Sequence, residues 1–465
     1  MTSLGPLPFV RVVLLDFNGG RTIVEAVEAV SKTVWPVDRL EIVCVDNGST
    51  DGSLEEIERK FPAVVTIRNG RNLGFPANNV AMTDLEDVDY VALVNSDALV
   101  PPTWLAPLVE CAESDPGIGS VCPKILLADQ FIELPIVFKG LEGRTKNAAV
   151  LRGVSVNGEN VFSRSHVANG GGRSSDRAGI FEWISDGSVL RVPMRSDVTP
   201  ISITDVEVEV ESFVNSVFSL NGAEGCERAV AAGERFVLSV SVAPKPVDVL
   251  NNVGSWLDES WVGHERGLYE VDLGQYDTSG DVGTWCGAAV LLRAAQLADV
   301  GVFEENFFLY YEDTDLAVRG RGRGWRIVLE PASVVRHIHS ASTVEGSEIA
   351  AFHIERNRLL LVLRHAPLDD VVREFVRYLL VTASYIRASF AQSIRRRRFP
   401  DFNHVGRRLR SFTGALRLLP PSIASRREIS SRRFIPRNEL RHQIALGSRD
   451  SATGDDEDGG LRSFL

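Results

Sequence analysis

The chain has 465 residues, of which 44% are hydrophobic and 24% are charged. These fractions are typical of a globular protein with a real core, and the length leaves room for two or three domains. No stretch of about 18 uninterrupted apolar residues is present, so a membrane-spanning helix is not expected. The net charge of −12 conceals a basic region, because residues 353–449 contain 21 Arg and no Lys against seven acidic residues, an excess of 14.

The five cysteines are widely spaced and form no Cys-x-x-Cys pair. This spacing predicts reduced thiols in a cytosolic protein rather than a disulfide framework or a zinc site. The first residues, Met1–Pro8, lack the basic region of a signal peptide, so none is expected.

Apolar runs alternate with segments of helical period through the first part of the chain. The expected strands are 10–15, 40–45, 64–67, 90–94 and 119–123, and the expected helices are 22–32, 53–60, 72–82 and 103–113. Strands that alternate with helices predict a mostly parallel sheet with both faces covered.

Several of these strands end in polar tips. The first is followed by Asp16-Phe17-Asn18-Gly19-Gly20, the second by Asp46 to Gly52, and the fourth by Asn95-Ser96-Asp97. In open parallel sheets, ligands bind outside the carboxyl ends of the strands, so we expect Asp46 and Asp97 to face one crevice. Considered alone, Asp97 would more simply open a turn.

The pattern changes over 133–248, which is rich in Val, Ser and Gly and alternates with a period of two, most clearly over Val206–Glu211. This alternation predicts an inserted antiparallel β domain with a sandwich-like arrangement. Trp183 and His166 in this region could bind sugar, although we favour ordinary surface and core roles for them.

Alternating apolar strands and helices resume near residue 249. An acidic group, Glu312-Asp313-Thr314-Asp315, precedes a helix-like run, where carboxylates also serve as capping residues. His337 and His339 follow a strand, and a spacing of two places both on the same side of an extended segment. The apolar run 284–292 is expected to form a strand, and a short strand is expected over 326–330.

The region after residue 350 is expected to form Arg-rich helices, followed by a disordered acidic tail. Leu, Phe and Tyr accompany the Arg residues over 375–390, which favours peripheral contact with a membrane surface. The alternative is a set of solvated helices whose Arg content reflects genome composition. No recognition motif supports binding of nucleic acid.

Taken together and in this order, the motifs resemble those of the inverting, metal-dependent nucleotide-sugar glycosyltransferases of family 2, which have a GT-A fold. Within the family they are similar to the bacterial rhamnosyltransferase and galactofuranosyltransferase-like group. The resemblance covers about 10–130 and 250–365. It is carried by Val45–Asp51, Asn69–Phe75, Asn95–Asp97, Trp285–Ala288, Phe308–Leu316 and His337–Thr343, with Asn251–Gly254 and Val271–Asp277.

The resemblance implies an α/β fold class with a GT-A nucleotide-binding domain and a mostly parallel sheet. The sequence pattern adds the inserted antiparallel β domain, which is not part of the family core, and the C-terminal helical region. The expected boundaries are 8–132 for the nucleotide-binding half, 133–248 for the insert, 249–350 for the acceptor and catalytic half, 351–449 for the Arg-rich helices and 450–465 for the tail.

The resemblance also implies residue roles. Asp313 would be the catalytic base, and Asp97 would hold a divalent cation, Mg²⁺ or Mn²⁺. His337 would contact the metal or the diphosphate, with His339 as the competing candidate. The nucleotide would be bound or its pocket shaped by Phe17, Asn18, Asp46, Asn72, Gly74, Asn95 and Ser96.

The chemistry of these residues suits sugar transfer. A hard cation binds through one or two carboxylates plus phosphate oxygens and stabilises the leaving diphosphate. A carboxylate base takes the proton of the acceptor hydroxyl as it attacks. Asn95 departs from the strict Asp-x-Asp form, so His337 or His339 would have to complete the metal shell.

The expected function is transfer of a sugar, with inversion, from a UDP- or dTDP-sugar to a glycan or polyprenyl-linked acceptor in cell-envelope polysaccharide synthesis. The expected location is the cytoplasm, at the inner face of the cell membrane. Two alternatives remain. Gly19-Gly20-Arg21 after the first strand would suit a sugar-nucleotide nucleotidyltransferase, and the β insert would suit a catalytically inactive glycan-binding protein.

Overall fold

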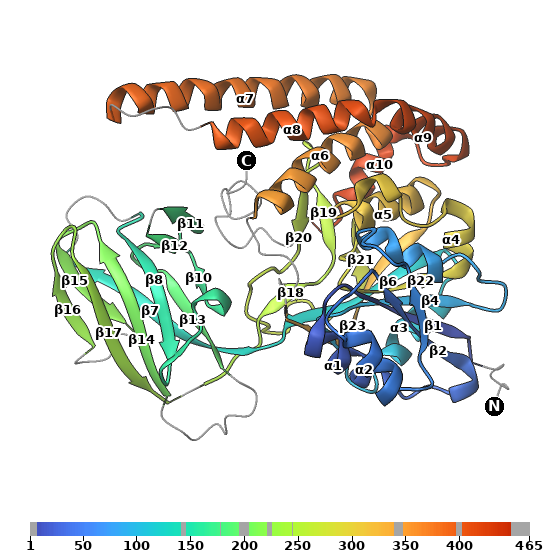
Figure 1. The fold of residues 1–465 in the computed structure, drawn as a ribbon, viewed down its shortest axis with the longest axis horizontal. Helices are drawn as coiled ribbons and strands as arrows, with labels where there is room; N and C mark the ends of the chain where they lie inside the picture. Colours follow the sequence, from blue (N-terminus) through green and yellow to red (C-terminus); the bar gives the residue numbers. More distant parts are fainter. Residues whose placement is uncertain are drawn as a thin grey trace. The chain divides into compact units, whose positions relative to one another are not determined.

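The structure is a computed structural model that describes residues 7–140, 146–176, 178–194, 204–220, 226–243, 245–338, 347–396 and 402–447. The chain divides into two compact units (Figure 1). The first unit contains the residues up to 126, residues 252–267 and the chain from 275 onward; the second contains 127–251 and 268–274. The acidic tail expected over 450–465 lies outside the described residues.

A mixed sheet forms the centre of the first unit, with the strand order β21-β23-β6-β22-β4-β1-β2-β3 and β5 paired with β23. Strands β1, β2, β3 and β4 pair in parallel, whereas β22 runs antiparallel to β4 and β6. The strands are β1 (Val10–Asp16), β2 (Leu40–Asp46), β3 (Val65–Arg68), β4 (Tyr90–Asn95), β5 (Ala98–Leu99), β6 (Ile118–Leu127), β21 (Gly280–Asp281), β22 (Ala289–Arg293) and β23 (Arg326–His337).

Helices cover this sheet because their apolar residues recur with the helical period. Helix α1 (Gly20–Ser31) buries Ile23, Val24, Val27 and Val30, as its spacing predicts. Helices α2 (Ser53–Lys60) and α3 (Leu105–Glu113) contribute to the same apolar core as α1, together with alternate residues of β1 and β4. The intervening residues of β4 are buried as well, which confirms that this strand is covered on both faces.

The helix expected over 72–82 is shorter and of a different type. The segment forms a 3-10 helix, η2 (Phe75–Ala81), after Gly74, which has a positive φ of 74° and an extended ψ of −163°. Side-chain amides replace the regular ladder here: Asn78 Nδ2 donates to the carbonyl of Phe75 at 2.9 Å, and Asn79 exchanges two hydrogen bonds with the backbone of Phe303.

Two expected strands also have different bounds. The apolar run 284–292 contributes only β22, because Trp285–Ala288 forms a loop before it. Conversely, the short strand expected over 326–330 is longer in the structure, where β23 runs from Arg326 to His337. The other connecting elements of this unit are β19 (Ser255–Leu257), β20 (Gly263–Glu265), α4 (Ala294–Val300), the 3-10 helices η1 (Val37–Arg39) and η4 (Glu305–Phe307), and α5 (Glu312–Gly322).

Five helices follow in the described part of the C-terminal region: α6 (Glu348–His365), α7 (Leu368–Arg396), α8 (Asn403–Arg417), α9 (Leu419–Arg432) and α10 (Arg437–Ile444). The leucines of α6 share an apolar core with Phe307 and Tyr311, so these helices support the segment that leads into α5. Among the helices that the structure describes, none combines the length and the apolar content needed to cross a bilayer.

The second unit consists mainly of two antiparallel sheets, with strand orders β10-β13-β7-β15-β16 and β11-β12-β8-β14-β17. Both sheets contribute to one apolar core, in which Val206, Val208 and Val210 of β14 alternate inward. The strands are β7 (Gln130–Lys139), β8 (Ala149–Val156), β9 (Glu159–Asn160), β10 (His166–Ala168), β11 (Arg173–Asp176), β12 (Gly179–Ile184), β13 (Val189–Met194), β14 (Thr204–Ser212), β15 (Ser216–Leu220), β16 (Glu227–Val230) and β17 (Arg235–Val242), with the 3-10 helix η3 (Phe162–Arg164) and β18 (Leu250–Asn252).

These observations confirm the expected fold class, including an antiparallel β insert and a C-terminal helical region. Trp183 of β12 makes ring contacts with Phe181 and Phe213, and His166 packs between Phe131 and Tyr269. Both residues therefore have packing partners within the second unit.

Candidate active site

The polar tips of three parallel strands lie at one edge of the sheet. Asp16 at the end of β1 is in register with Asp46 at the end of β2, and Leu15 is in register with Asn95 of β4. Asp16 is fully buried and accepts hydrogen bonds from the Gly19 amide at 2.9 Å and Ser53 Oγ at 2.6 Å. Burial raises the pKa of this carboxyl group.

Hydrogen bonds join the loops after β1 and β2. Asn18, at φ 53°, accepts a bond from the Thr50 amide at 2.8 Å, and its own amide donates to Ser49 Oγ at 3.0 Å. The Ser49 amide in turn donates to Asp46 Oδ1 at 2.8 Å. The side chain of Phe17 is 44% exposed beside this joined pair of loops.

Asn47, which the sequence did not single out, joins Asn72 and Gly74 to this edge. Its buried Nδ2 donates to Asn72 Oδ1 at 2.9 Å and to the Gly74 carbonyl at 3.1 Å, and its Oδ1 accepts from the Leu73 amide at 2.8 Å. The amide of Gly74 donates to Asn72 Oδ1 at 2.8 Å. A single side chain thus fixes the whole turn before η2.

Gly74 packs directly against the backbone of Phe308, near the start of α5. A Cβ atom on Gly74 would lie 1.9 Å from the Phe308 carbonyl oxygen. That same oxygen accepts a hydrogen bond from the Phe75 amide at 2.7 Å. The loop after β3 and the segment before α5 are therefore held together by backbone contact, which only glycine permits at this position.

Asp97 and His337 form a second pair beyond the tip of β4. Asp97 is buried, and its Oδ1 lies 3.0 Å from Nε2 of His337, which is also buried. The pairing of β5 with the end of β23 and a bond from the Ile338 amide to the Asp97 carbonyl at 2.9 Å place the two residues together. Ser96 is half-buried in the turn between them and β4, and His339 lies outside the described residues.

The donor set of this pair fits a divalent cation that also binds substrate. Two neighbouring ligands of an octahedral ion with bonds of about 2.1 Å lie about 3 Å apart, which matches the separation of the Asp97 and His337 donor atoms. Within the described residues, no three His, Cys, Asp or Glu side chains gather closely enough to hold an ion by themselves. Further oxygen ligands would have to come from a bound diphosphate.

Asp313, in the first turn of α5, is joined to the tip of β4 through the loop Trp285–Ala288. Its Oδ2 accepts a hydrogen bond from the Gly287 amide at 3.1 Å, while the carbonyl of Ala288 accepts one from the Asn95 amide at 2.9 Å. Thr314 donates from its amide and its hydroxyl to the other carboxylate oxygen of Asp313, at 2.5 and 3.1 Å. Burial raises the pKa of Asp313.

The structure separates the three carboxylates of the acidic motif. Asp315 is fully buried and is bound by Arg319 at 2.8 Å, Arg364 at 2.7 Å and His365 at 2.8 Å. Burial alone would raise its pKa, but the two arginines outweigh this and hold the pKa of Asp315 well below its usual range. Asp315 therefore anchors α5 to α6.

Glu312 is also buried, and its Oε2 has no hydrogen-bond partner. Burial, together with the neighbouring Asp313, raises its pKa well above the usual value. Asp313 alone of the three is only partly buried. Of the three carboxylates in the motif, it is therefore the one that solvent can reach.

The segment before α5 has an uncommon backbone. Phe308, Tyr310 and Tyr311 have φ values of 63°, 65° and 70°, a region that residues other than glycine rarely occupy. Asn357 of α6 supports this conformation, because its buried Nδ2 lies 2.7–2.8 Å from the carbonyl oxygens of Phe307, Leu309 and Tyr310. The sequence pattern did not predict the positive φ angles of these three residues or the supporting role of Asn357.

The sequence model of glycosyl transferase family 2 matches residues 12–147. These residues form a glycosyltransferase family 2 domain. The domain contains all the predicted strand tips, while Asp313 and His337 come from the chain that follows the β insert.

Several curated proteins resemble part of this chain. It is 34% identical over 123 residues to an N-acetylglucosaminyl-diphospho-decaprenol L-rhamnosyltransferase of Mycobacterium tuberculosis, which covers 25% of this chain and 39% of the relative. It is 29% identical over 110 residues to glycosyltransferase AglE of Haloferax volcanii, covering 23% and 35% of the two chains. The chain thus spans about two fifths or less of the length of these relatives.

Solved structures that resemble the chain include GalNAc-T7 with UDP, GalNAc and Mn²⁺, at 14% identity and a TM-score of 0.44, covering 92% of this chain and 59% of that one. Another is the mannosyltransferase PcManGT of Pyrobaculum calidifontis with GDP-Man and Mn²⁺, at 14% identity and a TM-score of 0.37, covering 94% and 81%.

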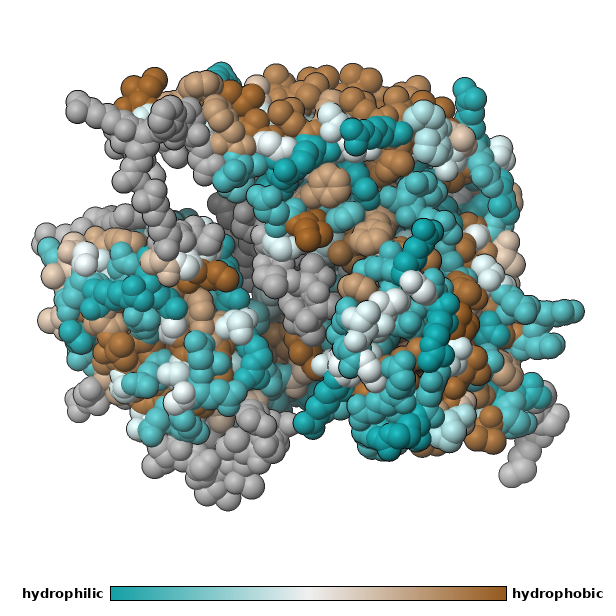
Figure 2. Space-filling model, in the orientation of Figure 1, coloured by the Kyte–Doolittle hydropathy of each residue, from teal (hydrophilic) through white to brown (hydrophobic). Residues whose placement is uncertain are grey.

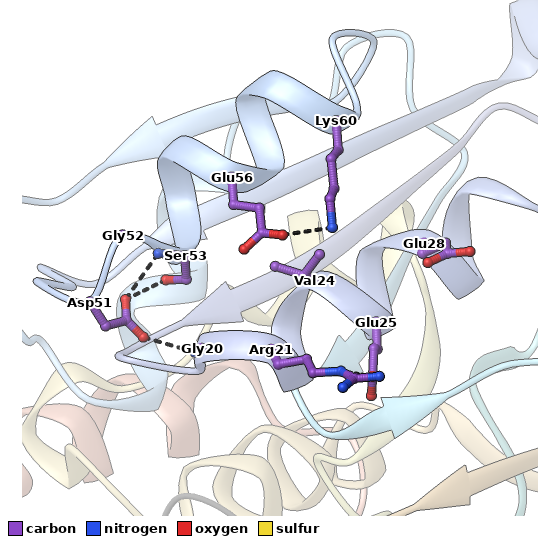
Figure 3. Close-up of a pocket in the computed structure, with 10 residues that line it drawn as sticks. All are labelled: Gly20, Arg21, Val24, Glu25, Glu28, Asp51, Gly52, Ser53, Glu56 and Lys60. Atoms are coloured by element: carbon purple, nitrogen blue, oxygen red, sulfur yellow. Dashed lines mark hydrogen bonds and ion pairs between the residues drawn. The ribbon is translucent and has the colours of Figure 1, made fainter.

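A hollow of about 500 Å³ lies between α1 and α2 of the family 2 domain (Figure 3). Its two cations are already paired, Arg21 with Glu25 at 2.5 Å and Lys60 with Glu56 at 2.6 Å. Glu28 and Asp51 add further negative charge to the lining. The lining of the hollow therefore does not suit a phosphate group. Arg21 pairs with Glu25 of the same helix, so it is not placed as the basic group of a nucleotidyltransferase loop.

Proposed function

We propose that the protein transfers a sugar, with inversion, from a UDP- or dTDP-sugar to a glycan or polyprenyl-linked acceptor in cell-envelope polysaccharide synthesis. The observation that carries this proposal is the position of Asp313. It is a partly buried carboxylate, and the loop Trp285–Ala288 connects it by hydrogen bonds to the strand tip that leads to Asp97. The likeness of part of the chain, 123 residues, to an N-acetylglucosaminyl-diphospho-decaprenol L-rhamnosyltransferase supports the acceptor class.

In this proposal Asp313 is the catalytic base. Its carboxylate takes the proton of the acceptor hydroxyl while the hydroxyl oxygen attacks the anomeric carbon. The bond from that carbon to the diphosphate oxygen breaks, and its electron pair leaves with the diphosphate. Attack from the side opposite the leaving group inverts the anomeric centre in one displacement.

The residues at the strand tips bind the donor. Asp46, Asn18 and Phe17 would contact the base or ribose, and Asn72, Gly74, Asn95 and Ser96 would shape the same pocket. Asp97 and His337, with His339 as the competing ligand, would hold Mg²⁺ or Mn²⁺, which stabilises the charge of the departing diphosphate. The acceptor class and the basic C-terminal region together favour a location of the enzyme at the cytoplasmic face of a membrane.

The test uses two variants of the intact chain. Asp313→Asn should reduce release of nucleoside diphosphate from UDP- and dTDP-sugars by about 10²–10⁴-fold, the usual contribution of a general base. This variant should still bind UDP or dTDP, and the rise in melting temperature on adding the nucleotide measures that binding. An exposed carboxylate variant, Asp38→Asn, is the matched control and should behave as the unaltered protein.

Asp97→Ala should instead remove the extra thermal stabilisation that Mg²⁺ or Mn²⁺ adds to UDP or dTDP. Unchanged turnover in Asp313→Asn would refute its role as the base. A metal effect that survives in Asp97→Ala would refute the metal site, and an enzyme that binds no sugar nucleotide would leave glycan binding as the better function.

A further inference from the structure

The polarity of α7 is reversed relative to that of an ordinary surface helix. Among the described side chains of α7, the fully buried ones are Asp370, Glu374, Tyr378 and Thr382, spaced four residues apart. An amphipathic surface helix normally buries its apolar stripe and exposes its polar one. Here a mainly polar stripe faces the protein, with Val371 and Phe375 partly buried beside it, and most of the remaining large aliphatic residues face outward.

The buried polar stripe of α7 is satisfied by partners on neighbouring helices. Glu374 is 3.0 Å from Arg358 of α6, and the hydroxyl of Tyr378 is 2.8 Å from Oε2 of Glu355 on α6. Arg408 Nε of α8 donates to Thr382 Oγ1 at 3.0 Å. These contacts fix the rotation of α7 about its axis, so the outward direction of its apolar residues is built into the fold.

The exposed apolar side chains of α7 form one continuous surface. Its members are 45–79% exposed and follow the helical period: Leu368, Val372, Val376, Leu379, Leu380, Phe390 and Ile394. Figure 2 shows apolar side chains gathered along α7, at the upper edge of the view. A helix of 29 residues is about 43 Å long. Exposed apolar residues along such a length form an extended apolar surface, unlike the single apolar residues that are common on protein surfaces.

We propose that the outer face of α7 lies on an anionic lipid surface, with its apolar residues in the boundary between headgroups and acyl chains. Arg387 is exposed on the same helix, and Arg373 and Arg377, which pair with Asp370 and Glu374, remain 49% and 53% exposed. Residues 353–449 have an excess of 14 positive charges, from 21 Arg and seven acidic residues. Such a helix binds acidic headgroups through its Arg residues and acyl chains through its apolar ones. Two copies of this basic face would repel each other, which argues against a second copy as the occupant.

This inference identifies the surface for the membrane contact proposed above. Its test measures vesicle binding without turnover, so it can fail independently of the proposed sugar transfer. The intact protein is floated with vesicles of phosphatidylcholine containing phosphatidylglycerol, and with vesicles of phosphatidylcholine alone. The unaltered protein should float with the anionic vesicles, and added salt should weaken the binding.

The triple variant Val372→Glu, Val376→Glu and Leu380→Glu should lower the fraction bound to anionic vesicles by about tenfold or more. Its melting temperature should stay the same, because all three side chains are exposed. The matched control places three Glu at exposed apolar positions outside α7, Val34→Glu, Val37→Glu and Ile180→Glu, and should float normally.

A second set, Leu368→Ala, Leu380→Ala and Ile394→Ala, adds no charge and keeps strong helix formers, and should also weaken binding. Normal flotation of both α7 sets would overturn the proposal, as would failure of the unaltered protein to float. A dimer that the Glu variant converts to monomers would overturn it too, because a second copy would then occupy this face.

Discussion

At the residue scale, the environment of Asp313 links its protonation to both activity and stability. Burial raises the pKa of its carboxyl group, and the hydrogen bonds from Thr314 and Gly287 oppose that shift only in part. A base must be deprotonated, so turnover should rise with pH through the raised pKa, above the usual value of about 3.9. The stability of the fold should depend on pH in the opposite direction to turnover. The carboxyl group of Asp313 contributes to folding stability at low pH, and this contribution is lost as pH rises through the raised pKa.

Thr314→Val tests this link. The hydroxyl of Thr314 donates to Asp313 Oδ1 at 3.1 Å and favours the charged form, so its loss should raise the pKa of Asp313 further. The acid limb of the pH–rate profile should therefore move to higher pH, while turnover on its plateau changes little. An acid limb that stays in place would show that another group controls it.

Gly74 provides a second prediction at this scale, with Gly70 as its control. Both have φ near 70°, but a Cβ on Gly70 meets nothing within 4 Å, whereas one on Gly74 would lie 1.9 Å from the Phe308 carbonyl oxygen. Gly70→Ala should cost about 1–2 kcal/mol of unfolding free energy from the left-handed backbone alone. Gly74→Ala should cost about 3 kcal/mol or more and weaken UDP or dTDP binding. Equal losses in the two variants, measured by urea unfolding, would mean that the contact with Phe308 is unimportant.

The residues that the sequence identified are those whose position follows from local pattern. Asp46, Asn95 and Asp97 follow apolar runs, and a parallel sheet brings such ends to one edge. Asn47 could not be identified in this way, because its partners are 25 to 27 residues away and amide side chains occur in many loops. The separation of Asp313 from Asp315 likewise depends on Arg364 and His365, about 50 residues later.

At the element scale, the sequence predicted most strands and helices but not the conformation of the segment before α5. Aromatic residues favour strands, and nothing in Phe307–Tyr311 indicates a left-handed backbone. That conformation is imposed by tertiary contacts, chiefly the three carbonyl contacts of Asn357 and the packing of Gly74 on Phe308. The reversed polarity of α7 was equally hidden, because its periodicity is that of any amphipathic helix and does not reveal which face is buried.

Asn357→Leu tests the support that α6 gives to this segment. Leu has a similar size but no donor, so buried carbonyls would lose a partner, at a cost of about 1–3 kcal/mol of unfolding free energy. Because the segment leads directly into Asp313, turnover should fall more than UDP or dTDP affinity. Asn438→Leu, at an exposed position of α10, is the matched control and should change neither. A stability loss without any change in the ratio of turnover to affinity would assign Asn357 a purely structural role.

At the scale of the whole molecule, the two units have separate apolar cores. The core between the β sheets of the second unit contains residues from 132 to 242, and the core around β1, β4 and α1 contains none of them. The proposed catalytic residues, Asp97, Asp313 and His337, all belong to the first unit. The sequence could predict a β insert because its period changes from that of helices to two. Its strand pairing could not be predicted, because it depends on residues as far apart as the pair Ile136 and Leu220 of β7 and β15.

Excision of the β insert should therefore leave donor binding intact. Phe131 and Val247 exchange two backbone hydrogen bonds, at 2.9 and 2.8 Å, as a paired position that flanks a hairpin turn. Replacing residues 132–246 with Asn-Gly, which favours a two-residue turn, should close the chain there without disturbing the first unit. The shortened protein should bind UDP or dTDP with Mg²⁺ as the full chain does, because Asp46, Asn72 and Asp97 keep their surroundings. Loss of nucleotide binding in a variant that still unfolds cooperatively would show that the insert contributes to the donor site, whereas retained binding with altered acceptor use would assign it to the acceptor.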